Sequence, residues 1–173
     1  LAELASSAAE DPLLATAGPI LTRLRDITGE SAQLFRRQGD LRICSAAVER
    51  PSGLRDTVPL GAQLSMTAGS AAQVLLAWEE PENLPRLLKE TTFTMLSLQQ
   101  VRRRGWAQSV AEREPGVASV SAPVLSPSGK IIAAVSVSGP IERLTRQPGR
   151  LHAPAVMAAA ERLSEVLRRN GTE

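Results

Sequence analysis

Serine residues recur at every second position in two neighbouring stretches of the chain. Ser119 and Ser121 lie two residues apart in the first stretch, and Ser136 and Ser138 lie two apart in the second. Both stretches are rich in Val, which favours β-strands, and residues two apart in a strand point to the same face. The pattern predicts a sheet that packs a core on one face. The other face, with its row of hydroxyl groups, would line a polar pocket for an oxygen-rich small molecule.

The same serines lack the surroundings of a nucleophile. A nucleophilic serine is activated by a neighbouring base, and no serine lies in a Gly-x-Ser-x-Gly elbow. The chain has one histidine, His152, and one cysteine, Cys44. His152 has no carboxylate close by in sequence, and Cys44 lies in an expected strand, where a small buried residue is typical. We therefore expect no catalytic residue, no metal site and no cofactor.

A second polar feature is the expected helix start at Gly69-Ser70-Ala71-Ala72. The first N–H groups of a helix have no partner within the helix, and the helix dipole adds partial positive charge there. These amides can receive a carboxylate. An ordinary helix start packed against a sheet has the same sequence, so both interpretations stay open.

One motif points to an enzyme instead. The run Arg102-Arg103-Arg104-Gly105-Trp106-Ala107 fits the Arg-x-x-Gly-x-Ala pattern of acetyl-coenzyme-A-binding acetyltransferases. In those enzymes the pattern lies between a strand and the start of a helix, whereas here it ends an expected helix and leads into a strand. The three arginines alone are typical of a solvated helix end, where cations suit the dipole. An acyl-coenzyme-A-dependent acetyltransferase stays as the enzymatic alternative.

Composition indicates a globular domain. The chain has 173 residues, of which 43% are hydrophobic and 22% charged, and this length can bury a core without disulfides. Aromatic residues make up only 2%, so Ala, Leu, Val and Ile must fill the core. The net charge of +2 is too small to indicate nucleic-acid binding. A single cysteine fits a reducing cytoplasm, and no run of about 18 apolar residues predicts a membrane span.

The elements that position these groups alternate in runs of helices and strands, which favours an α+β architecture. The expected elements are a helix begun by Asp11-Pro12 and ended by Gly29, a hairpin of residues 31–37 and 40–48, a helix from Ala68 to about Trp78 capped by Thr67, short helices at 82–90 and 95–104, a strand at 106–110, the serine hairpin at 117–140, a loop at 141–149 and a helix at 151–169.

The turn of the serine hairpin decides whether Ser119 belongs to the pocket. A three-residue loop at 127–129 places Ser119 opposite Val137, whereas a loop of two or four residues places it on the face of Ser136, because a slip of one residue reverses every side chain. The pocket interpretation requires the second arrangement.

Four stretches share a wider pattern. They are Gly105-Trp106-Ala107, residues 114–124, residues 129–140 with their Ala-Val-Ser-Val-Ser-Gly-Pro sequence, and Arg143-Leu144-Thr145. Together they resemble the effector-binding domain of the IclR family of bacterial transcription regulators. Residues 61–77 are similar to an upstream family motif, and the resemblance covers about residues 13–169.

The resemblance implies a GAF-like fold of the α+β class, with a curved antiparallel sheet flanked by helices on both faces. It implies a non-catalytic, cytoplasmic domain at residues 11–173 that binds a small organic effector carrying a carboxylate and forms a homodimer or homotetramer. In the family a winged helix-turn-helix domain precedes this one and binds DNA. We expect that domain to be absent here, with residues 1–10 as the end of the linking helix.

Carried over position by position, the family's pocket falls on six residues: Ser70, Ala71, Ser109, Ser119, Ser136 and Ser138. The family often has an acidic residue at the place of Ser109 and a cysteine at that of Ser119. The hydroxyls found here make the pocket less acidic and favour an anionic effector. An oligomerisation domain with a vestigial pocket is the structural alternative.

Overall fold

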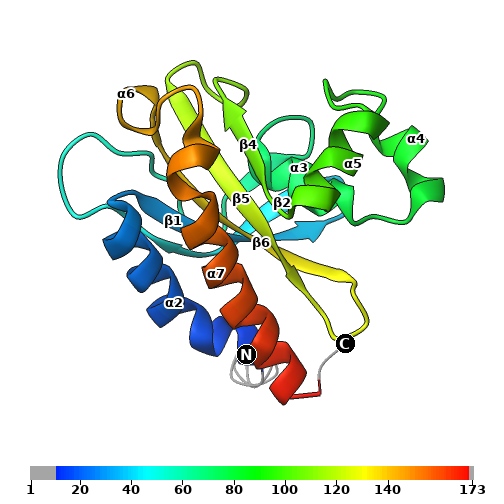
Figure 1. Ribbon diagram of the computed structural model, residues 1–173, viewed down its shortest axis with the longest axis horizontal. Helices are drawn as coiled ribbons and strands as arrows, with labels where there is room; N and C mark the ends of the chain where they lie inside the picture. Colours follow the sequence, from blue (N-terminus) through cyan, green and yellow to red (C-terminus); the bar gives the residue numbers. More distant parts are fainter. Residues whose placement is uncertain (1–10, 172–173) are drawn as a thin grey trace.

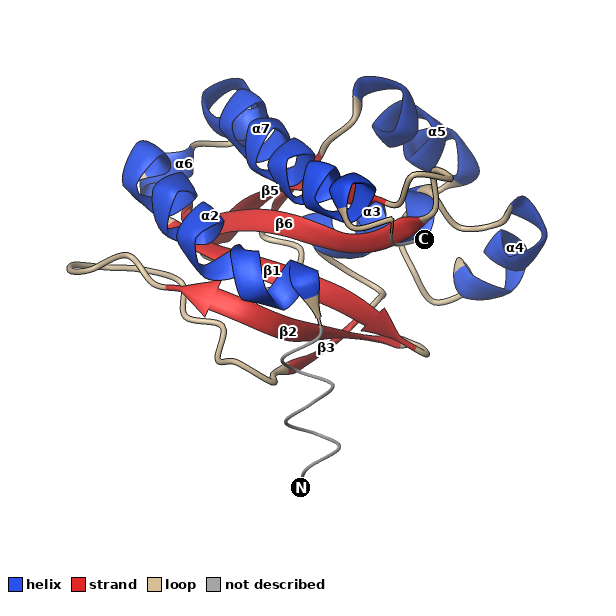
Figure 2. Ribbon diagram, turned by 90° about the horizontal axis from the view of Figure 1, so that it is seen from below, coloured by secondary structure: helices blue, strands red, loops and turns tan. Residues whose placement is uncertain are grey.

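Six strands form one curled sheet at the centre of the computed structural model, which describes residues 11–171 (Figure 2). Neighbouring strands are antiparallel throughout, in the order β3-β2-β1-β6-β5-β4. In chain order the strands are β1 (Ser31–Gln38), β2 (Leu41–Val48), β3 (Gln63–Ser65), β4 (Ala107–Val110), β5 (Val117–Leu125) and β6 (Ile131–Pro140). The predicted curved antiparallel sheet is confirmed.

Helices cover both faces of the sheet, as the predicted fold class requires. On one face α2 (Pro12–Thr28) and α7 (Pro148–Arg169) lie side by side (Figure 1). On the other face α3 (Ser70–Ala77) packs against the sheet and α5 (Met95–Arg104) packs against α3. The shorter helical turns are η1 (Pro81–Asn83), α4 (Leu84–Leu87) and α6 (Ile141–Leu144).

Two apolar cores, one on each face, follow from the alternation of side chains along the strands. Val135 and Val137 of β6 point toward α2 and α7, where they join a core that includes Leu21 and Leu163. The second core lies around α3 and α5 and includes Cys44. Ser136 and Ser138 alternate with the two valines, so they lie on the α3 face of the sheet.

The start of α2 combines a helix cap with an ion pair. The Asp11 carboxylate accepts hydrogen bonds from the backbone N–H of Leu13 at 3.0 Å and of Leu14 at 3.2 Å. Both oxygens also accept from the Arg36 guanidinium of β1, at 2.6 and 3.0 Å. Gly29 ends the helix in the left-handed conformation. The boundaries predicted for this helix are confirmed.

Because the Arg36 guanidinium lowers the pKa of Asp11 below 3.8, the charged form stabilises the fold. This contribution is complete above pH ~4 and is lost as the pH falls further, toward the lowered pKa. Asp11→Asn keeps the cap but not the charge, whereas Asp11→Ala loses both and is expected to lower the free energy of unfolding by about 1–2 kcal/mol at neutral pH. Urea denaturation should show the gap between wild type and Asp11→Asn narrowing below pH ~4. A gap unchanged at low pH would contradict this account.

Three predicted boundaries differ from the structure. Thr67 does not cap α3, since its hydroxyl bonds to Ser65 at 2.6 Å and the N-cap residue is Gly69. The expected loop at 141–149 contains the turn of α6, and α7 begins early, at Pro148, because proline suits the first turn of a helix. The expected helix at 82–90 is reduced to the turns η1 and α4. The helix predicted for residues 1–10 lies outside the described residues.

The serine hairpin reaches the register that the pocket requires by an unexpected route. Its turn is the three-residue type, because the backbone N–H of Ser126 donates to the carbonyl of Lys130 at 2.9 Å. That loop alone would have placed Ser119 opposite Val137. Instead Ser119 pairs with Ser138.

A β-bulge near the turn causes this change of register. Leu125 pairs with Ile131, but Val124 pairs with Ala133, so one residue of β6 is left over. An extra residue in one strand moves every later side chain to the opposite face. Beyond the bulge all four serines of the hairpin share the α3 face of the sheet.

Candidate functional site

Five serine hydroxyls form one hydrogen-bonded chain where α3 begins against the sheet. Ser70 of α3 bonds to Ser119 at 2.6 Å and to Ser121 at 2.7 Å, both on β5. Ser121 bonds on to Ser136 of β6, and Ser119 bonds to Ser109 of β4 at 2.7 Å. The chain therefore ties the first residue of α3 to three strands, and it gathers oxygen atoms at one place.

A cavity of about 20 Å³ lies beside this serine chain. All six residues that the sequence predicted for the pocket line it: Ser70, Ala71, Ser109, Ser119, Ser136 and Ser138. Gln33 of β1 extends the polar wall, because its amide nitrogen donates to Ser138 at 3.0 Å. The free volume is that of about one water molecule, so a larger ligand needs its walls to move.

Three charged side chains line the same cavity: Arg42 of β2, Asp56 of the β2–β3 loop and Arg113 of the β4–β5 loop. Arg113 and Asp56 form an ion pair at 2.5 Å. Arg42 is only 3% exposed, and burial together with the charge of Arg113 lowers its pKa to about 10. Arg113 thus balances the charge of the Asp56 carboxylate, and the positive charge of Arg42 is left without an ion pair among residues 11–171.

Gly69 brings the guanidinium of Arg42 against the start of α3. Its φ of 101° belongs to the region that favours glycine, and a Cβ there would lie 2.9 Å from Nη2 of Arg42. The backbone N–H of Gly69 donates to Oε1 of Glu112 at 3.1 Å, and burial raises the pKa of that carboxyl. A side chain at position 69 would push the arginine away from the helix start.

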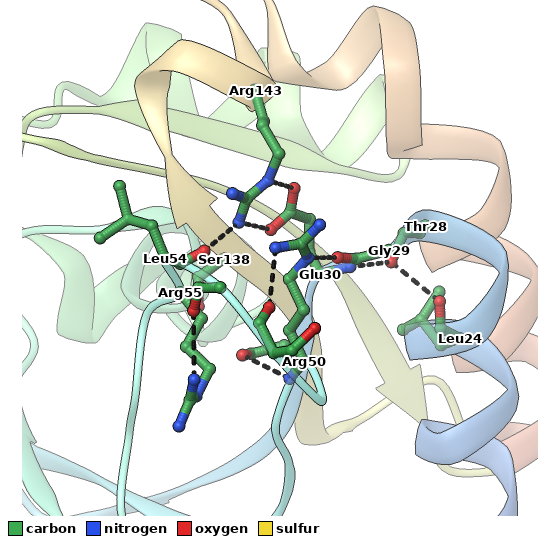
Figure 3. Close-up of polar contacts among 12 residues, drawn as sticks. Leu24, Thr28, Gly29, Glu30, Arg50, Leu54, Arg55, Ser138 and Arg143 are labelled. Carbon is green, nitrogen blue, oxygen red and sulfur yellow. Dashed lines mark hydrogen bonds and ion pairs between the residues drawn. The ribbon is translucent and has the colours of Figure 1, made fainter.

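An ion pair outside the cavity lining holds the loop that carries Asp56. The guanidinium of Arg143, in α6, donates to both carboxylate oxygens of Glu30 at 2.7 Å (Figure 3). It also donates to the backbone carbonyl of Leu54 at 2.5 Å, and Arg50 donates to the carbonyl of Gly29 at 2.7 Å. The β2–β3 loop is thereby held to the α2–β1 turn and to α6.

Sequence reasoning missed five polar or charged residues of this site, among them Gln33. Ser121 has the same alternation as Ser119 and was left out of the predicted pocket. Arg42, Asp56 and Arg113 carried no such pattern, because a charged residue in a hairpin or a loop is most often exposed. Arg42 and Asp56 are buried and Arg113 is partly buried only in the tertiary structure, which local sequence does not supply.

The other reactive side chains lie away from the cavity. Cys44 is buried in the core around α3, and burial raises the pKa of its thiol to about 11. His152 is half-buried in α7, where burial lowers its pKa. Across residues 11–171 no three His, Cys, Asp or Glu side chains are grouped to hold a metal ion.

The thiol of Cys44 is expected to resist alkylation in the folded protein. At pH 8 a pKa of about 11 lowers the thiolate fraction roughly 200-fold relative to a free cysteine, and burial adds to this protection. Mass spectrometry after treatment with iodoacetamide, with and without urea, measures the two rates. Equal rates in the folded and unfolded states would contradict the buried, inert assignment.

The arginine run 102–104 ends α5, and Gly105 follows it in the left-handed conformation before β4. The order of helix and strand is thus inverted relative to the acetyltransferase pattern, as the sequence predicted. The sequence profile described as "Bacterial transcriptional regulator IclR C-terminal" matches residues 5–165. The chain belongs to the IclR family. This family is not one of enzymes, so the acetyltransferase alternative falls.

Relatives of this IclR-family chain include named regulators and solved domains. It is 33% identical over 165 residues to the HTH-type transcriptional regulator BhcR of Paracoccus denitrificans, covering 88% of the chain and 59% of BhcR. It is 29% identical over 146 residues to the HTH-type transcriptional repressor AllR of Escherichia coli K12, covering 77% of the chain and 54% of AllR. The chain thus spans little more than half the length of these relatives.

Solved structures agree with the fold of this IclR-family chain. A putative IclR regulator from Silicibacter sp. superposes with a TM-score of 0.85 at 25% identity, covering 100% of this chain and 72% of that one. The C-terminal domain of a putative transcriptional regulator from Vibrio cholerae gives 0.75 at 30% identity, covering 86% and 94%. Within the described part of the chain, no helix is long and apolar enough to cross a membrane.

Proposed function

We propose that this chain is the effector-sensing part of a transcriptional regulator, and that the cavity beside the serine chain binds a small organic acid. The observation that carries the proposal is the convergence of six predicted residues on one cavity that also holds Arg42. Hydroxyls and helix-start amides donate hydrogen bonds to oxygen, and a buried cation favours an anion. Binding through these groups involves no catalytic step.

DNA binding would come from a helix-turn-helix domain in a longer protein, because BhcR and AllR are HTH-type transcriptional regulators. We propose a cytoplasmic homodimer or homotetramer in which the effector favours one arrangement of subunits over another. Such a shift requires that the effector bind the two arrangements with different affinity. The β2–β3 loop contributes Asp56 to the cavity lining, and we expect effector binding to move this loop.

A thermal-shift screen of the 173-residue chain tests effector binding. The panel holds short hydroxy and oxo acids, each with its primary amide, at about 10 mM. A ligand at 100 times its dissociation constant stabilises the fold by about 2.7 kcal/mol, which raises the melting temperature by several degrees. We expect one or more acids, but not their amides, to produce this shift.

The small volume of the cavity favours one alternative, an oligomerisation domain with a vestigial pocket. The same screen separates the two functions. If no acid raises the melting temperature while the chain still associates in solution, the vestigial pocket is the better account.

A further inference from the structure

We propose that Arg42 is the counter-charge of the effector, so that the effector's carboxylate binds between this guanidinium and the first-turn amides of α3. The proposal rests on the proposed function and names the residue that makes the pocket prefer acids.

The first observation is that Arg42 is buried with an unsatisfied hydrogen-bond donor. Its Nη1 atom donates to the backbone carbonyls of Ser65 and Ala68. Its Nε atom is buried and has no partner among residues 11–171, and its Nη2 atom lies beside Gly69. The Nε–Nη2 edge of a guanidinium is one of those that bind a carboxylate in bidentate fashion.

The second observation is electrostatic. Arg42 forms no ion pair with any described residue, although buried arginines are normally paired. The charge of Arg113 repels it, and the positive end of the α3 dipole lies beside it. Glu112 attracts it through space, but its carboxylate oxygens are engaged by Gly69 and Gln73.

These two observations converge on one place in the cavity. Gly69, the residue before α3, lies against Nη2 of Arg42, so the guanidinium and the start of α3 are neighbours, and both favour an anion. A carboxylate bound there would satisfy Nε and supply the missing negative charge. The remaining oxygen atoms of the effector would then meet the serine chain on β5 and β6.

Calorimetric titration tests this assignment with acetate, glycolate and lactate, each beside its primary amide. Wild type should prefer an acid to its amide, and Arg42→Gln should reduce that preference about 10- to 100-fold, because the acid loses a charged partner and the amide at most a neutral hydrogen bond. Arg42→Lys keeps the positive charge but loses the two parallel N–H donors of the guanidinium, so its preference for the acid should lie between those of wild type and Arg42→Gln. Arg36→Gln is the matched control, because Arg36 also has a buried Nε but lies outside the cavity lining.

A spectroscopic readout keeps the test independent of how the variants fold. In the wild-type protein, the assigned Arg42 Nε–Hε resonance should move on titration with the bound acid and stay in place with its amide. A preference unchanged in Arg42→Gln, or a resonance that does not move, overturns the role of Arg42 while the pocket stands. Failure of all the acids and amides to bind wild type counts against the effector pocket itself, and against Arg42 with it.

Discussion

Gly139→Ala is expected to lower the free energy of unfolding by about 3 kcal/mol or more. A Cβ at this position in β6 would collide with Oε1 of Glu30 and would lie 2.8 Å from Cδ1 of Leu144. Glu30 cannot yield easily, because it is 3% exposed and both of its oxygens accept from Arg143. The methyl group must either displace the carboxylate from its partner or deform β6.

Urea denaturation measures this loss, and the chain offers a matched control. Gly116 has nothing within 4 Å of an added Cβ and carries no left-handed φ, so Gly116→Ala should change the free energy of unfolding by less than about 0.5 kcal/mol. The two variants add the same methyl group. If Gly139→Ala proves as stable as Gly116→Ala, then the Glu30–Arg143 pair adapts and its geometry is not a constraint.

The Glu30–Arg143 pair matters for more than stability, because Arg143 also bonds to the backbone of Leu54 in the loop that carries Asp56 (Figure 3). Asp56 in turn pairs with Arg113 at the cavity. A methyl group at Gly139 would therefore disturb the cavity wall as well as the core. Folded Gly139→Ala protein should melt earlier and respond more weakly to acids.

Alternation and caps are local, so the sequence predicted most helices and the main strands, whereas the six pocket positions came from the resemblance to the IclR family. Asp11 begins α2 and Gly29 ends it, and each does so through contacts with residues at most four positions away. The register of the serine hairpin was harder. The turn had the expected length, yet the bulge between Val124 and Leu125 reversed its consequence for Ser119. A bulge depends on packing along two strands, and no short pattern encodes it.

The burial of the charged side chains at the cavity could not be predicted from local sequence either, because it also depends on packing between distant segments. Arg42 lies in a short hairpin, where its sequence suggests exposure, but residues 65–69, which lead into α3, pack against it and it is buried. The error at Thr67 belongs to the same region. A hydroxyl residue is a good helix cap in isolation, but the close approach of Arg42 requires glycine at the start of α3.

Ser119→Asp is expected to weaken the binding of acids such as lactate about 100-fold or more. Ser119 is partly exposed and lies on the cavity, so an aspartate there can stay ionised. Two carboxylates about 4 Å apart repel by about 4 kcal/mol at the effective dielectric constant of a protein surface, and relaxation reduces that figure. The new carboxylate would also compete with the acid for Arg42 and for the amides of α3.

Ser119→Asn separates charge from shape. It has nearly the same size as the aspartate, and it also breaks the bonds from Ser119 to Ser70 and Ser109. If charge decides, calorimetry should show that the asparagine variant loses less than about 10-fold, since only neutral hydrogen bonds are lost. Equal losses of affinity in the two variants would show that the cavity selects by shape. Tighter binding to the aspartate variant would show that the effector is a cation and not an anion. Because the hydroxyl chain itself is neutral, preference for an anion must come from Arg42 and from the start of α3, and a negative charge at position 119 should cancel it.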